Sequence, residues 1–274
     1  MTKPELHTDS DLKRAERAAV EAAKSVGILM RRHLRETKRA NEVTQHDIKL
    51  ELDVRAQKII ERTLRSAFPN VDVLGEEGNT GNTRGDDRWV VDPIDGTVNF
   101  AYTIPHACVS IALQAKAQKG KADYADGYNS VVGVVYDPFC DEMWTTIRGQ
   151  PARLNGKVIQ VSTRRKLEDC IVSIGFAKSK ESVERTLPYF NELVPRVRKI
   201  RMMGAAALGL AYVASGRFDA YIERGINLWD IAAGGLLIES AGGEFWHEAI
   251  PGREHGYTVI ANNGLLRRTL RAPA

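Results

Sequence analysis

The chain has 274 residues, of which 43% are hydrophobic and 27% are charged, and its formal net charge is +4. This composition excludes an intrinsically disordered chain and provides ample material for a hydrophobic core. The small net charge does not by itself indicate a nucleic-acid partner, and no apolar run approaches the roughly 20 residues that cross a bilayer. The polar N-terminus has no apolar segment of the kind found in secretory signals, which predicts a cytoplasmic protein. The three cysteines, Cys108, Cys140 and Cys170, lack C-x-x-C spacing and are predicted to be reduced thiols.

The first half of the chain predicts two helices followed by a series of strands. An apolar stripe with a 3.6-residue period predicts a helix over residues 12–36, capped by Ser10 and Asp11. A second helix is expected over 53–68, opened by Asp53. Short apolar runs between turn signals then predict strands over residues 71–77, 88–95, 109–116, 131–136, 142–147 and 158–162.

The second half alternates strands and helices more regularly. Strands are expected over residues 170–176, 199–203, 218–223, 244–246 and 257–262. Helices are expected over residues 181–197, 205–216, 229–242 and 265–271. Interleaved strands and helices indicate an α/β or α+β layered fold. Because no repeat or flexible linker divides the chain, we expect a single domain over residues 1–274, with a soft internal boundary near residue 150.

Acidic residues stand at the ends of three elements that look buried: Glu76 with Glu77, Asp92 with Asp95, and Asp230. Crowded carboxylates repel one another and lose hydration unless a cation neutralises them. Oxygen ligands suit Mg²⁺, which is commonly held by a few carboxylates together with water and a substrate phosphate. Each acid alone could instead cap a helix, as Asp95 and Asp230 could. The set taken together favours a metal site.

The stretch D-P-I-D-G-T-V-N-F over residues 92–100 separates two phosphatase families. In haloacid-dehalogenase-like enzymes one residue lies between the two acids, whereas two residues separate Asp92 from Asp95. With G-E-E over 75–77, W-D-I-A-A-G over 229–234 and the spacing of Asp47 and Asp53, the sequence resembles the inositol monophosphatase family, the lithium-sensitive, Mg²⁺-dependent phosphatases. The resemblance covers nearly the whole chain. It implies a layered αβαβα sandwich of the inositol monophosphatase and fructose-1,6-bisphosphatase type.

The resemblance also implies the ligands of two or three Mg²⁺ ions. One ion would be held by Glu76, Asp92 and the carbonyl of Ile94, and a second by Asp92, Asp95 and Asp230. A third, weaker ion would use Glu76 through water. Two ions bridged by one carboxylate can hold a phosphate from both sides and activate a bound water as the nucleophile.

Further roles are implied for residues beside the metal ligands. Thr97 would orient the attacking water, and Asp53 would accept the proton of its hydroxyl. With Glu76, these are the implied catalytic residues. The N–H groups of Gly96 and Thr97 would bind phosphate at the start of a helix. The implied substrate-binding residues are Asp95, Gly96, Thr97, Ala206 and Glu223.

Departures from the family pattern leave the substrate open. The family's serine is Ala205 here, one of its acids is Gly209, and residues 47–53 lack its threonine. The substrate could be inositol monophosphate or a related sugar or cyclitol phosphate; alternatives are histidinol phosphate, fructose 1,6-bisphosphate and adenosine 3′,5′-bisphosphate. A non-catalytic regulator of transcription or RNA-associated machinery is the competing function, but the expected carboxylates are all present and favour an enzyme. The resemblance implies a homodimer, with no membrane or nucleic-acid partner expected.

Overall fold

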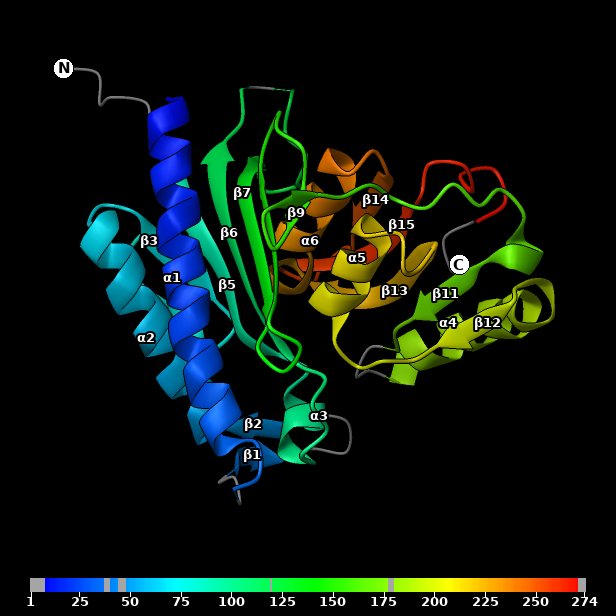
Figure 1. Cartoon of the computed structure of the whole chain (residues 1–274), viewed down its shortest axis with the longest axis horizontal. Coiled ribbons are helices and arrows are strands. Elements are labelled where there is room, and N and C mark those ends of the chain that lie inside the picture. The colour runs from blue at the N-terminus through cyan, green and yellow to red at the C-terminus, as the bar shows by residue number, and fades with distance from the viewer. Residues whose placement is uncertain (1–7, 37–39, 44–47, 119, 177–179, 271–274) are drawn as a thin grey trace.

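The computed structural model describes residues 8–36, 40–43, 48–118, 120–176 and 180–270. Helices and sheets alternate in five layers, so the predicted αβαβα sandwich is confirmed (Figure 1). Three hydrophobic clusters fill the spaces between successive layers. None of the described helices is both long and apolar enough to cross a membrane.

The larger sheet has eight strands in the order β10-β9-β8-β7-β6-β5-β3-β4, in which only β3 and β5 pair in parallel. Its outer face is covered by two helices, α1 (Asp9–His33) and α2 (Glu51–Ala67) (Figure 1). The strands are β3 (Asp72–Gly75), β4 (Gly78–Asn79), β5 (Asp87–Asp95), β6 (Cys108–Lys116), β7 (Tyr128–Asp137), β8 (Glu142–Ile147), β9 (Arg153–Leu154) and β10 (Lys157–Val158). A separate short hairpin pairs β1 (Ala40–Val43) with β2 (Ile48–Leu50), and α3 (Thr97–Ala101) follows β5.

The smaller sheet has five strands in the order β12-β11-β13-β15-β14. Its strands are β11 (Ile171–Ile174), β12 (Lys199–Arg201), β13 (Ala220–Asn227), β14 (Glu244–Ala249) and β15 (Gly256–Asn262). The helix α4 (Lys180–Leu193) packs on its outer face, next to the short 3₁₀ turn η2 (Val194–Arg196). Another 3₁₀ turn, η1 (Leu167–Asp169), precedes β11.

Two helices, α5 (Ala206–Ala214) and α6 (Leu228–Ser240), form the middle layer between the sheets. They are apolar on nearly all sides because both faces pack against a sheet. The close contact between α6 and β7 depends on Gly133, where a Cβ atom would lie 2.9 Å from the carbonyl oxygen of Ala233. This packing brings the N-terminus of α6 beside the end of β5.

Some predicted element bounds are wrong. The strand expected over 158–162 shrinks to β10, because Ile159 and Val161 donate backbone hydrogen bonds to Ala152 and Ala241 instead of to a neighbouring strand. The helix expected over 265–271 is absent from the described part of that range, which forms turns.

The chain passes from the larger sheet to the smaller one between β10 and β11, somewhat after the boundary expected near residue 150. The single domain over residues 1–274 stays a prediction.

Candidate active site

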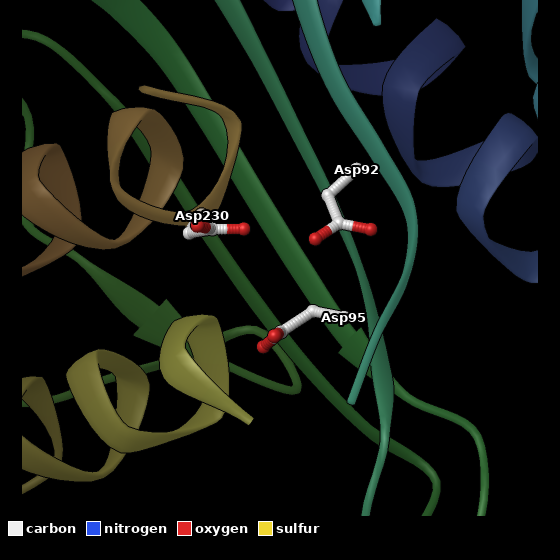
Figure 2. A group of neighbouring side chains, drawn as sticks. All are labelled: Asp92, Asp95 and Asp230. Carbon is white, nitrogen blue, oxygen red and sulfur yellow. The ribbon is translucent and has the colours of Figure 1, made fainter. Parts of the chain in front are cut away.

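Three aspartates from two elements meet between the layers. Asp92 and Asp95 lie at the end of β5, and Asp230 lies in the first turn of α6. Each offers a carboxylate oxygen, and the three atoms lie within 4.8 Å of one another (Figure 2). Asp92 and Asp95 are buried, whereas Asp230 is half-buried. Of the acids predicted to converge, the three aspartates lie together in the fold; Glu76 lines a cavity beside them, and Glu77 is not among the residues that line it.

A β-bulge in β5 explains how two acids three positions apart face the same cluster. In a regular strand, residues separated by three positions point to opposite faces of the sheet. Here Asp92 pairs with Ser110 and Asp95 with Cys108, so β5 has one more residue than β6 over this step. The extra residue reverses the alternation, and Pro93, which has no N–H to donate, lies within the irregular step. The Ile94 amide donates to Asp92 Oδ1 at 3.0 Å and fixes the bulge locally.

Asp95 also caps a helix that lies far away in the sequence. The amides of Ala206 and Ala207 donate to its two oxygens at 3.1 and 2.7 Å. The N-cap residue of α5 is Ala205, which has no side-chain acceptor, so the carboxylate from β5 satisfies these amides. The Ala206 N–H, which we expected to touch the substrate, is used by Asp95 in this structure.

Asp230 and Asp53 occupy equivalent places in their helices. Asp230 Oδ2 accepts the backbone N–H of Asn227 at 2.9 Å, and Asp53 Oδ2 accepts that of Leu50 at 2.9 Å. Each is the third residue of its helix, so α2 begins two residues earlier than predicted. One aspartate can therefore cap a helix and also belong to the acidic cluster, as Asp230 does.

The turn after β5 places Thr97 over the Ile94 carbonyl. Gly96 has φ 89°, and a Cβ atom there would lie 2.9 Å from the His106 carbonyl oxygen, so both conformation and space require glycine. The Thr97 hydroxyl donates to Ile94 O at 2.9 Å. A hydroxyl has one hydrogen, so it is not donated to Asp53 here, and the Thr97–Asp53 pair stays a prediction. Because α3 has only five residues, the phosphate binding predicted there would rest on local N–H groups more than on a helix dipole.

A cavity of about 880 Å³ opens beside the cluster. Among the predicted site residues, Asp53 alone is absent from its lining; this residue is buried in the first turn of α2. Asp47 lies outside the described residues. The predicted residues that line the cavity are Glu76, Asp92, Ile94, Asp95, Gly96, Thr97, Ala206, Glu223 and Asp230.

Comparisons with known proteins agree with this geometry. The sequence pattern of the inositol monophosphatase family matches residues 11–268. The chain belongs to the inositol monophosphatase family. It is 40% identical over 265 residues to Nus factor SuhB of Pseudomonas aeruginosa, covering 92% of this chain and 93% of that protein. It is 38% identical over 232 residues to Inositol monophosphatase 1 of Solanum lycopersicum, covering 82% and 81% of the two chains. The crystal structure of extragenic suppressor protein suhB from Bartonella henselae superposes with a TM-score of 0.80 at 32% identity, covering 92% of this chain and 95% of that one.

The electrostatics of this family member's cluster suit a cation. Burial, together with the negative charges of Glu76, Asp95 and Asp230, raises the pKa of Asp92 well above its usual range. Burial raises the pKa of Asp95 to about 6, although the hydrogen bonds from Ala207 and Ala206 act in the opposite direction. An all-carboxylate donor set of this kind, with one cavity side open to water, fits a hard divalent ion such as Mg²⁺.

Sequence reasoning missed the support of Glu223. The Tyr221 hydroxyl donates a hydrogen bond to Glu223 Oε2, and both residues lie on the same face of β13. Two glycines provide the space: a Cβ atom at Gly175 would lie 1.9 Å from Glu223 Oε2, and one at Gly209 would lie 2.6 Å from the Tyr221 ring. The alternation Tyr-x-Glu along a strand was the available signal. A side chain at position 209, such as the acid expected from the family resemblance, would collide with the Tyr221 ring as it packs here.

Proposed function

We propose that the chain is a Mg²⁺-dependent phosphomonoesterase that hydrolyses a small phosphorylated metabolite. The observation that carries the proposal is the group of three aspartates within 4.8 Å of one another beside a cavity of about 880 Å³. Such a cluster cannot meet a phosphate dianion unless cations lie between the like charges. The family membership supports the same class of reaction.

Two or three ions are proposed, with the ligands Glu76, Asp92, Ile94, Asp95 and Asp230. When bound, the metal would supply positive charge to the phosphate and lower the pKa of a water molecule. The hydrogen bonds from Ala206 and Ala207 orient Asp95, and that from Asn227 orients Asp230.

The chain's other residues have proposed roles around the reacting group. The N–H groups of Gly96 and Thr97 would hold the phosphate, and Asp53 would receive a proton through the Thr97 hydroxyl. Glu223, held by Tyr221, would accept a hydrogen bond from a substrate hydroxyl. This acceptor favours a sugar or cyclitol phosphate such as inositol monophosphate. Histidinol phosphate, fructose 1,6-bisphosphate and adenosine 3′,5′-bisphosphate are the alternatives.

A panel of these phosphates, assayed with Mg²⁺ for released inorganic phosphate, tests the proposal. We expect turnover of at least one sugar, cyclitol, amino-alcohol or nucleotide phosphate. Absence of release from every member of the panel would overturn the enzymatic function.

A second candidate function is that of a Nus factor, because a relative with this name is 40% identical over nearly the whole chain. Expression of the wild type and of Asp92→Asn in an Escherichia coli strain lacking SuhB would test it. Restoration of the parental phenotype by both proteins would support a Nus-factor role that does not need hydrolysis. Failure of both would argue against this candidate.

Mg²⁺ is expected to raise the melting temperature, because a ligand bound only by the folded state stabilises that state. Excess EDTA is expected to abolish turnover, because the proposed activation of water needs the metal. Burial raises the pKa of Asp95 to about 6, so below that pH a proton competes with the cation for this carboxylate. The apparent Mg²⁺ affinity should therefore increase from about pH 5 to about pH 8. Thermal-shift titrations with Mg²⁺ at several pH values measure this apparent affinity. Undiminished turnover in EDTA would contradict the prediction, and Li⁺ or Ca²⁺ should lower activity.

A homodimer is expected, with a surface near the cavity as its interface. Tyr102 and Met202 are 69% and 61% exposed, and Ile104, which follows Tyr102 after α3, is 48% exposed. Asn99 of α3 donates to the Met203 carbonyl at 2.7 Å and brings the two segments together. Exposed apolar groups of this kind mark interaction surfaces. Light scattering should give the dimer mass for the wild type and the monomer mass for Tyr102→Glu; a monomeric wild type would refute the prediction.

A further inference from the structure

Two arginines line the cavity together with the acids: Arg224 on β13, and Arg253 in the hairpin between β14 and β15. Among the described residues that line the cavity, these are the only basic ones. Neither makes an ion pair with a carboxylate of the described chain. Their side chains donate hydrogen bonds to neutral groups, Arg224 to Thr258 and Arg253 to Asn227. A guanidinium without an acidic partner beside a phosphatase site is available to an anion.

Arg253 is placed close to the metal cluster by a short series of hydrogen bonds. Its Nη2 donates to Asn227 Oδ1 at 2.9 Å, and the Asn227 backbone N–H donates to Asp230 Oδ2 at 2.9 Å. A single residue, the N-cap of α6, therefore connects the guanidinium with an aspartate of the cluster. The arginine faces the same end of α6 that faces the proposed ions.

Gly256 makes room for the arginine stem. A Cβ atom at Gly256 would lie 2.5 Å from both Cγ and Cδ of Arg253. Gly256 is the first residue of β15 and is not among the glycines with positive φ, so its backbone conformation does not require glycine. The missing side chain instead allows the stem to lie flat across the hairpin. Packing of the stem and the bond to Asn227 together fix the position of the charged group.

The cavity is large for a small-molecule site. Its volume of about 880 Å³ lies near the upper end of the range for small-molecule sites, roughly 300–1,000 Å³. The cluster of aspartates takes up one part of this space, and Arg253 bounds another part. A substrate that fills the cavity would extend from the proposed ions toward the arginine.

We infer that Arg253, together with Arg224, forms a second anion subsite and that the substrate carries a second phosphate besides the one that is hydrolysed. This inference rests on the proposed phosphatase function. A planar guanidinium can donate two parallel hydrogen bonds to a phosphate, a geometry that an ammonium group does not reproduce. The hydroxyl acceptor Glu223 is compatible with mono- and bisphosphates alike, so the subsite decides between them: it favours bisphosphates such as fructose 1,6-bisphosphate and adenosine 3′,5′-bisphosphate over histidinol phosphate and inositol monophosphate.

Matched substrate pairs test the subsite: fructose 1-phosphate with fructose 1,6-bisphosphate, and adenosine 3′-phosphate with adenosine 3′,5′-bisphosphate. The wild type should have the lower KM for each bisphosphate. Arg253→Gln should raise KM for the bisphosphates by about 10- to 100-fold, the usual effect of losing a charged hydrogen bond, and change that for the monophosphates by less than about twofold. The KM of Arg253→Lys for the bisphosphates should fall between those of the wild type and Arg253→Gln. The control is Arg153→Gln, since Arg153 is exposed, lies on β9 outside the cavity lining, and its side chain donates its hydrogen bond to the Gly156 carbonyl, at 2.8 Å.

The other outcomes overturn the inference. An equal loss for both members of a pair would mean that Arg253 acts on the hydrolysed phosphate or on the N-terminus of α6, and no change would mean that it binds no substrate. Calorimetric titration of the same pairs into the Ca²⁺-loaded protein separates binding from turnover. Equal binding of mono- and bisphosphate would overturn the subsite even if monophosphates are hydrolysed, whereas tight bisphosphate binding without hydrolysis of any substrate would overturn the proposed function alone.

Discussion

Asp92→Asn is expected to lower phosphate release by on the order of 10³-fold or more, because metal ions contribute several kcal/mol to a phosphoryl transition state. Asp92 is the carboxylate proposed to contact both ions, and it lies within the group of three aspartates at the end of β5. An amide has no formal charge to offset a divalent ion. Higher Mg²⁺ concentrations should therefore not restore the activity, which steady-state kinetics at increasing Mg²⁺ will measure.

Although Asp92→Asn should lower activity, it should not lower stability in the absence of metal. Burial and the neighbouring acids raise the pKa of Asp92, so the fold favours its protonated form. For such a group, the stability contribution is present at low pH and is lost as the pH rises through the folded pKa. In EDTA above neutral pH, Asp92→Asn should melt no lower than the wild type, and it should gain little from added Mg²⁺.

Asp137→Asn is the matched control for this pair of measurements. Asp137 is equally buried, ends β7 of the same sheet, and accepts the Phe139 and Cys140 amides through one oxygen that asparagine retains. It does not line the cavity. Normal Mg²⁺-dependent activity is expected there. Substantial activity in Asp92→Asn, or an equal loss in Asp137→Asn, would show that the ligand assignment is wrong.

Asp53→Asn is expected to lower kcat by about 10²- to 10⁴-fold, the usual contribution of a general base, with little change in Mg²⁺ dependence or KM. Thr97→Ala should have the same effect, because Thr97 is proposed to transfer the proton. The alternative is that Asp53 has only a structural role. Asp53 accepts the Leu50 N–H as the third residue of α2, so it could serve only the helix end.

Two substitutions at Asp53 distinguish these roles. Asparagine keeps an oxygen that can accept the Leu50 N–H, whereas alanine removes it. A capping role predicts near-normal kcat in both variants and about 1 kcal/mol of lost stability in Asp53→Ala. A proton-accepting role predicts a low kcat in both. Asp11→Asn is the control, because Asp11 joins Thr8 at the exposed start of α1, where a small change in melting temperature and normal kcat are expected.

The order of elements and the acids of the cluster could be predicted because each depends on a local pattern. The continuous apolar run of β5 corresponds to a strand that is buried on both faces, and the acids follow it directly. The spacing of Asp92 and Asp95 indicated chemistry, but the bulge that turns them to one side is a property of the pairing with β6. Strand pairing depends on residues distant in the sequence, so the cause of the convergence could not be predicted.

The remaining parts of the site depend on packing between elements. The cap that Asp95 provides for α5, and the bond from Arg253 to Asn227, join segments that carry no mutual signal in the sequence. Local patterns also misled at the C-terminal end. The leucines and arginines near residue 268 suggested a helix, yet the Asn262 and Asn263 side chains accept the amides of Gly264 and Leu265 and form turns instead.

The division of the cluster between β5 and α6 has a consequence for how the protein acquires its site during synthesis. Asp92 and Asp95 emerge from the ribosome long before Asp230, and the α5 amides that hold Asp95 also emerge later. A nascent chain that has formed only the larger sheet therefore lacks the α5 amides that cap Asp95 and holds no complete set of the proposed ligands. Binding at the proposed metal site becomes possible only after the middle helices dock, so a bound ion would report that the chain has been synthesised through α6 and that this layer has formed.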